Sequence, residues 1–124
     1  MDEDSRRWLG CQGERLAGEH LVRQGFQIVE RNFRTRFGEL DIVAYDGRVL
    51  AFCEVKTRRL RPREGSPFDA IRMPKRSQVR RMAAVWLSQR SERPYAPELR
   101  FDAIGVTFDP SGRLVSIEHL EGAF

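Results

Sequence analysis

Two apolar segments flank the dipeptide Asp46-Gly47, and this arrangement constrains the fold more than any other feature of the chain. Asp-Gly between alternating apolar runs is a strong local signal for a β-hairpin closed by a tight two-residue turn. We therefore predict antiparallel strands at Glu39–Tyr45 and Arg48–Thr57. A two-residue turn would place Leu40 opposite Cys53, so that apolar residues meet across the hairpin.

The same register brings acidic side chains together on the hairpin. It places Glu39 opposite Glu54 and makes Asp41 a diagonal neighbour of Glu54, and such neighbours lie within about 5–7 Å of each other. Residues two apart on a strand share a face, so Lys56 lies beside Glu54. Like charges this close repel, and a divalent cation or the Lys56 ammonium would relieve the repulsion. The sequence thus predicts a cluster of three carboxylates and a lysine.

The remaining elements fit one domain, because 124 residues suffice for a single hydrophobic core spanning 1–124. Helical spacing and Pro at helix entries predict helices at about Ser5–Gln24 and after Ser66-Pro67 and Met73-Pro74. The apolar stripe of the last helix is Val79, Met82, Ala83 and Trp86. Further strands are predicted at Phe26–Phe33, Leu99–Phe108 and Arg113–His119. Gly10 and Gly13 lie on or beside the apolar stripe of the first helix. Close approach of that helix to a sheet would explain them, and simple fraying is the alternative.

Basic residues are concentrated after the acidic hairpin. The chain carries 22 basic and 18 acidic residues, and ten of the basic ones but only two of the acidic ones lie between Lys56 and Arg81. This distribution favours a polyanionic partner, with a solvated loop as the alternative. We predict a loop from Arg58 to Gly65 and expect its arginines to emerge at the rim of the acidic cluster, where a nucleic acid backbone would lie. The predicted contacts are Arg58, Arg59, Arg61, Arg63, Lys75 and Arg76.

Cysteine usage and hydropathy predict the compartment. Cys11 and Cys53 form no disulfide framework, and Cys53 occupies a position that suits a small apolar residue within a strand. The acidic first residues lead into no apolar leader segment, and no apolar stretch approaches membrane-spanning length. We expect a cytoplasmic protein without a membrane partner.

An oxygen-rich cluster beside a lysine suits Mg²⁺ or Mn²⁺. Asp41 and Glu54 would hold the ion, and Lys56 would position the water it activates or stabilise phosphate charge. Glu39 is either a further ligand or a solvated strand end. The alternative for the whole motif is a surface salt bridge between Glu54 and Lys56, worth at most about 1 kcal/mol. The two histidines, His20 and His119, lack zinc-ligand spacing and are predicted to be structural. Asp102, within Arg100-Phe101-Asp102, is expected to pair with an arginine.

The hairpin sequences ELDIVA at Glu39–Ala44 and LAFCEVK at Leu50–Lys56 resemble the core of the PD-(D/E)XK nucleases. Nearly the whole chain resembles the YraN family of bacterial proteins, through Gly13–Ala17, Gly25-Phe26, Arg31-Asn32, Phe37–Glu39, Lys75 and Arg100–Asp102. The resemblance implies a restriction-endonuclease-like α/β fold similar to archaeal Holliday junction resolvases. In that fold a central mixed sheet of about five strands lies between helices in three layers.

The resemblance also implies roles for individual residues. Asp41 matches the first acid of the motif, Glu54 the second acid and Lys56 the lysine, while Leu40 stands where the motif name has proline. Glu14 matches a helical glutamate that completes some resolvase sites. The implied catalytic set is therefore Glu14, Asp41, Glu54 and Lys56, and the implied metal ligands are Asp41, Glu54 and Glu39. By analogy with resolvases, the resemblance implies a homodimer.

Three functions remain open on the sequence. The leading hypothesis is a Mg²⁺- or Mn²⁺-dependent endonuclease acting on DNA, in particular branched or structured DNA, rather than RNA. The second is a non-catalytic nucleic-acid-binding module on the same fold, which would bind in a salt-sensitive manner without turnover. The third is an adaptor for protein partners.

Overall fold

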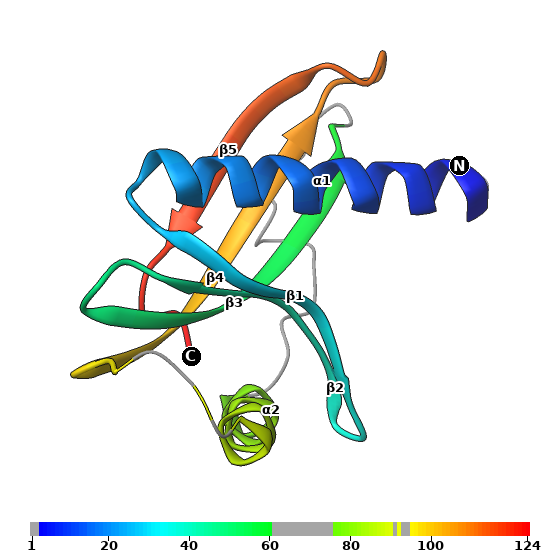
Figure 1. Ribbon diagram of the computed structural model, residues 1–124. Helices are drawn as coiled ribbons and strands as arrows, with labels where there is room; N and C mark the ends of the chain where they lie inside the picture. Colours follow the sequence, from blue (N-terminus) through cyan, green and yellow to red (C-terminus); the bar gives the residue numbers. More distant parts are fainter. Residues whose placement is uncertain (1–2, 61–75, 91, 93–94) are drawn as a thin grey trace.

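Five strands form one mixed sheet between two helices in the computed structural model, which describes residues 3–60, 76–90, 92 and 95–124 (Figure 1). The elements are α1 (Glu3–Arg23), β1 (Gln27–Thr35), β2 (Gly38–Tyr45), β3 (Val49–Arg59), α2 (Arg76–Gln89), β4 (Glu98–Phe108) and β5 (Leu114–Leu120). The sheet order is β1-β2-β3-β4-β5, with β3 and β4 parallel and every other pair antiparallel. The predicted restriction-endonuclease-like α/β fold is confirmed.

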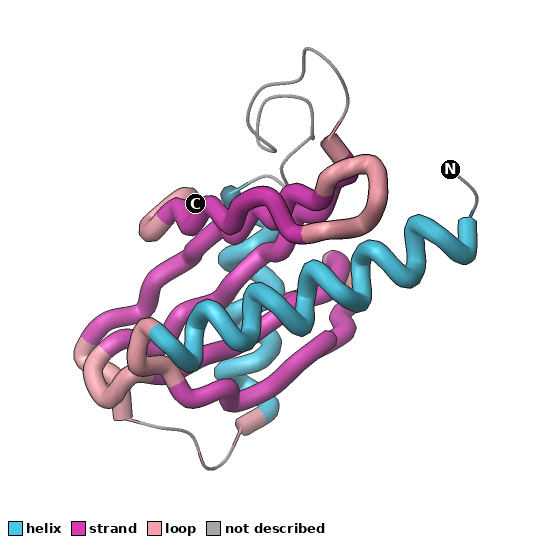
Figure 2. Tube along the Cα trace, turned by 90° about the horizontal axis from the view of Figure 1, so that it is seen from above, coloured by secondary structure: helices cyan, strands magenta, loops and turns pink. Residues whose placement is uncertain are grey.

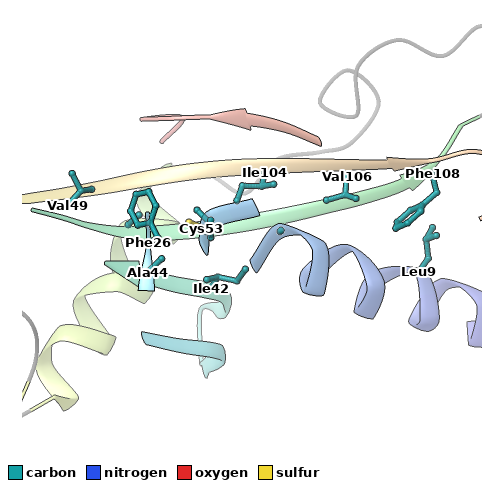
Figure 3. Close-up of a cluster of buried hydrophobic side chains, with 12 residues drawn as sticks. Leu9, Phe26, Ile42, Ala44, Val49, Cys53, Ile104, Val106 and Phe108 are labelled. Atoms are coloured by element: carbon teal, nitrogen blue, oxygen red, sulfur yellow. The ribbon is translucent and has the colours of Figure 1, made fainter. Parts of the chain in front are cut away.

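The helices cover opposite faces of the sheet (Figure 2). Alternation along β3 sorts its side chains between the two faces: Ala51 and Cys53 pack on the α1 side, and Leu50 and Phe52 on the α2 side. Figure 3 shows the cluster on the α1 side, to which α1 contributes Leu9, Ala17 and Leu21. The α2 side includes Val79, Met82, Ala83 and Trp86, the apolar stripe expected from the sequence. Neither described helix is long and apolar enough to cross a membrane.

The pairing register of the β2–β3 hairpin differs from the prediction by two residues. Ile42 pairs with Cys53, whereas a two-residue turn would have paired Ile42 with Ala51. The reason is a wider loop, residues 46–49, in which the Asp46 carboxylate accepts the N–H groups of Arg48 at 2.9 Å and Val49 at 2.6 Å. A shift of two residues leaves every side chain on its original face. The apolar pattern therefore could not distinguish the two registers.

β2 and β3 separate beyond the Ile42–Cys53 pair, although β2 begins at Gly38 and β3 continues to Arg59. In Figure 1 the hairpin of β1 and β2 bends away from β3 towards α2. β3 instead stays paired with β4 as far as Phe108. The prediction of a loop beginning at Arg58 is therefore wrong. The opening between β2 and β3 is where the predicted site residues gather.

Side-chain alternation is broken at the point where the strands separate. Leu40 packs on the α2 side and Ile42 on the α1 side, although two residues apart on a regular strand share a face. On the neighbouring strand, Asn32 adopts a left-handed conformation with φ of 55°, which is uncommon for residues other than glycine. The irregularity lets Asp41 lie on the same side as α1.

Gly13 lets α1 approach β3 closely. A Cβ atom added at Gly13 would lie 2.0 Å from Thr57 Oγ1, whereas one added at Gly10 would meet no atom within 4 Å. Close approach therefore explains Gly13 but not Gly10.

We expect Gly13→Ala to lower the free energy of unfolding by about 1–3 kcal/mol, because the clash must be relieved by moving α1 or Thr57. Gly10→Ala is the matched control on the same helix and should gain up to about 1 kcal/mol from helix propensity. Urea denaturation of both variants tests this. A Gly13→Ala protein as stable as the Gly10→Ala protein would contradict it.

Candidate functional site

Three carboxylates meet in the opening between β2 and β3. Glu14 comes from α1, and Glu39 and Asp41 come from β2; one oxygen from each lies within 4.8 Å of the others. Asp41 is only 8% exposed, and its Oδ2 accepts the N–H of Val55 at 2.7 Å. The Asp41 side chain thus accepts a hydrogen bond from a backbone N–H of β3 that lies just beyond the last paired residues of β2 and β3. This contact holds one carboxylate firmly in place at the centre of the group.

Glu54 and Lys56 form an ion pair on β3. Lys56 Nζ lies 3.1 Å from Glu54 Oε1, and the two side chains are 23% and 13% exposed. The predicted common face is thereby confirmed, and the burial distinguishes this pair from an exposed surface salt bridge. Among the described residues, the group of three neighbouring carboxylate oxygens does not include Glu54. Its third member, beside Glu39 and Asp41, is Glu14, whereas the sequence predicted Glu54.

Burial and mutual repulsion disfavour the ionised forms of the acidic side chains in the site. Burial, followed by the charge of Glu54, raises the pKa of Asp41 to about 8. Burial and then Glu39 raise the pKa of Glu14. Burial also raises the pKa of Glu54, although the Lys56 ammonium opposes that change. A bound cation would favour the ionised forms of all these groups, and hard divalent cations prefer such oxygen ligands.

Asn32 is a site residue that reasoning about local chemistry missed. With its amide nitrogen turned towards the cluster, it donates to Glu14 Oε2 at 2.9 Å and to Glu39 Oε1 at 2.8 Å. The left-handed backbone at Asn32 permits this inward orientation. Asparagine tolerates that conformation better than most residues, but nothing in the sequence pattern showed where the strand would adopt it.

The structure places only some of the basic residues predicted to contact nucleic acid. Arg58 and Arg59 lie half-buried at the end of β3, and Arg58 Nε donates to Thr107 Oγ1 at 3.4 Å. They are therefore part of the sheet and not of a loop. Arg76 is exposed at the first position of α2. Arg61, Arg63 and Lys75, together with the helix entries at Ser66-Pro67 and Met73-Pro74, lie outside the described residues.

A second polar cluster surrounds Asp102 on β4. The Asp102 carboxylate accepts hydrogen bonds from Arg100 Nε at 2.9 Å and from the Gly122 N–H at 3.0 Å, and it lies 2.9 Å from His119 Nε2. His119 Nδ1 lies 3.1 Å from His20 Nε2. The expected pairing of Asp102 with an arginine is confirmed. The contact between the histidines, 99 positions apart in sequence, was not predicted.

Comparisons with known proteins give one consistent match. A family model described as "Uncharacterised protein family UPF0102" matches residues 13–106, a range that contains every acidic site residue and Lys56. A UPF0102 protein of Frankia alni is 48% identical over 94% of this chain and 93% of its own length. A UPF0102 protein of Nocardia farcinica is 43% identical over 94% of this chain and 88% of its own length. One of Geobacter metallireducens is 44% identical, over 94% and 91% respectively.

Proposed function

The chain belongs to the uncharacterised protein family UPF0102, and from the geometry of its acidic site we propose that it is a metal-dependent endonuclease that hydrolyses phosphodiester bonds in DNA. The observation that carries the proposal is the convergence of Glu14, Glu39 and Asp41 beside the half-buried pair of Glu54 and Lys56. The restriction-endonuclease-like fold and the resemblance to PD-(D/E)XK nucleases support the same reaction. Branched or otherwise structured DNA is the substrate class suggested by the resolvase resemblance.

Glu14, Glu39 and Asp41 would hold Mg²⁺ or Mn²⁺. The three donors are all carboxylate oxygens within 4.8 Å of one another. Burial, followed by neighbouring carboxylates, raises the pKa values of Asp41 and Glu14, and a bound cation would oppose that change. When bound, such an ion lowers the pKa of a coordinated water and stabilises charge on the phosphate. The chain offers no comparable set of three ligands elsewhere among its described residues.

Lys56 and Glu54 would orient the reacting groups. Glu54 holds the Lys56 ammonium 3.1 Å from its own Oε1, which fixes the direction in which the remaining N–H bonds point. Those N–H groups can donate to a phosphate oxygen or to the attacking water, whose orientation lowers the barrier to in-line attack. Glu54 thereby acts both on the charge of the site and on the position of Lys56.

A non-catalytic nucleic-acid-binding role is the competing function, and one observation favours it. Several acids of the site already have partners within the chain, since Asn32 bridges Glu14 and Glu39 and Lys56 pairs with Glu54. A site that satisfies its own charges in this way has less need of a metal. The two functions differ in turnover, which the following experiment measures.

We expect the wild-type protein with Mn²⁺ to cut at least one DNA in a panel of linear duplex, single strand and four-way junction, and Glu54→Gln to abolish the cleavage. The substitution keeps the shape of the side chain but releases Lys56 from its ion pair. Glu19→Gln, on the exposed side of α1, removes the same charge away from the site and should leave cleavage intact. Equal cleavage by the Glu54→Gln protein would contradict the role of Glu54. Binding without cleavage by the wild type would favour the non-catalytic role.

A further inference from the structure

The tip of the β1–β2 hairpin and α2 form the two sides of an open groove. The cavity measures about 570 Å³ and is lined by Arg34, Thr35 and Arg36 from the hairpin and by Val85, Ser88 and Gln89 from α2. Figure 1 shows the hairpin tip lying beside this helix. We propose that the groove binds the phosphodiester backbone of the DNA strand whose scissile bond lies at the acidic site. The inference rests on the proposed function in assigning the bound strand to the substrate.

The composition of the groove matches that of a phosphate site. Of its six described lining residues, two are arginines, three are polar and uncharged, and none is acidic. α2 itself carries Arg76, Arg80 and Arg81 without any Asp or Glu between Arg76 and Gln89. The planar guanidinium of arginine matches phosphate oxygens with paired N–H donors, and hydroxyl and amide groups add hydrogen bonds to the backbone. A groove of this composition favours an anionic ligand such as a phosphate.

The hairpin tip is held rigidly against α2, so the groove exists before a ligand binds. Gln78 on α2 donates its side-chain N–H to the carbonyl of Phe37 at 2.6 Å. The guanidinium groups of Arg36 and Arg81 lie 4.9 Å and 5.6 Å from the centre of the Phe37 ring. Thr35 Oγ1 accepts the N–H of Phe37 at 3.0 Å and closes the turn. The cation–π contact and the turn therefore position Arg36 with little further loss of entropy on binding.

One ion pair of the hairpin links a residue of the groove to the acidic site. Arg34 pairs with Glu39 across the two strands, and Arg34 Nε lies 3.4 Å from Glu39 Oε2. The Arg34 side chain is 86% exposed, and such an exposed ion pair costs little to exchange for a phosphate contact. A strand bound by Arg34 and Arg36 would thus lead directly to the carboxylate of Glu39.

The test is DNA binding in EDTA, where neither metal binding nor cleavage contributes. Fluorescence anisotropy with a labelled oligonucleotide, single-stranded and as a duplex, compares Arg34→Ser/Arg36→Ser with Arg48→Ser/Arg113→Ser. The second protein loses the same charge at the exposed β2–β3 and β4–β5 turns. We expect only the groove variant to weaken binding, by about tenfold or more for each lost arginine. Its plot of log affinity against log salt should be shallower by about two.

Gln89→Glu is a second test of the groove, and it leaves Arg34, the ion-pair partner of Glu39, in place. It places a negative charge in the groove, and Gln24→Glu, just after α1, is its matched control. We expect weakened binding in the first protein only. Equal losses in groove and control proteins, unchanged binding in the groove variants, or no binding by the wild type would each overturn the proposal. Groove-dependent binding by a wild type that cuts nothing in Mn²⁺ would uphold the groove and reject the nuclease.

Discussion

The Asp41→Asn protein is expected to be more stable than the wild type at pH 8 without metal, and to have lost both Mn²⁺ binding and DNA cleavage. Asp41 is buried among the other carboxylates, and burial together with Glu54 raises its pKa to about 8. An amide at this position removes one charge from the cluster while its carbonyl can still accept the Val55 N–H. We expect a gain of roughly 1–3 kcal/mol at pH 8.

The size of this stability gain depends on pH. Because the pKa of Asp41 is higher in the folded than in the unfolded chain, the folded state binds more protons between pH of about 4 and about 8. The contribution of Asp41 to stability therefore falls as pH rises through that window. The advantage of the asparagine variant should vanish near pH 4 and be greatest at pH 8. Mn²⁺ should reverse the order at pH 8, since only the wild type gains binding energy from the metal.

Thermal unfolding at pH 5 and pH 8, with EDTA or Mn²⁺, and calorimetric titration with Mn²⁺ measure these effects together. Glu19→Gln again serves as the control, because it removes one carboxylate that lies exposed on α1. A destabilised Asp41→Asn protein that retains Mn²⁺ binding would show that Asp41 supports the fold and not a metal site. Unchanged stability with lost binding would leave the metal role standing and remove the proposed charge repulsion.

Local patterns predicted the elements because each depends on residues close in sequence. The strands on either side of Asp46-Gly47 and the helix stripe ending at Trp86 appear where alternation and helical spacing placed them. The pairing register of β2 and β3 was not predicted, because the Asp46 carboxylate stabilises a longer loop by accepting N–H groups within it. A shift of two residues conserves the apolar faces, so hydrophobic pattern alone contains no information about it.

The site was predicted in part, and its missing features arise from broken regularity. Strict alternation placed Asp41 near Glu54, yet Asp41 reaches Glu14 only because alternation fails between Leu40 and Ile42. Glu14 itself came from the family resemblance, because helix spacing shows which side of α1 it lies on but not what lies opposite. Asn32 depends on a left-handed residue within a strand, which no periodic pattern signals.

Long-range contacts were the least accessible to sequence reasoning. His20 and His119 lie on α1 and β5, and only the packing of α1 across the sheet brings their ring nitrogens to 3.1 Å. His119 in turn contacts Asp102, which sequence spacing had linked only to Arg100. The complete chain of contacts joins three elements and is therefore a property of the fold.

Asp102→Ala is expected to lower the free energy of unfolding by about 3–5 kcal/mol, because it leaves a half-buried arginine and other donors without this fully buried acceptor. The side chain of Asp102 is fully buried, while that of Arg100 is 19% exposed. Burial opposes ionisation of Asp102, but hydrogen bonds from His119, Arg100 and the Gly122 N–H together hold its pKa below the usual range. Replacement by alanine removes the shared acceptor of all three donors.

The lowered pKa sets the pH at which this loss should appear. A depressed folded-state pKa stabilises the protein above the ordinary value of 3.8 and ceases to do so as pH falls through the folded-state pKa. The difference between wild type and Asp102→Ala should accordingly be full at pH 7 and shrink in acid. Glu98→Ala, at the exposed start of the same strand, should change stability by no more than about 0.5 kcal/mol.

Mn²⁺ affinity separates this structural role from a role in the acidic site. None of the contacts of Asp102 involves Glu14, Glu39 or Asp41 among the described residues, so the folded fraction of the Asp102→Ala protein should bind Mn²⁺ as the wild type does. Calorimetric titration under conditions that keep the variant folded measures this. Wild-type stability in the variant would mean that the Arg100–Asp102–His119 contacts contribute nothing to the fold. Loss of Mn²⁺ affinity in a folded variant would instead place Asp102 in the function of the acidic site.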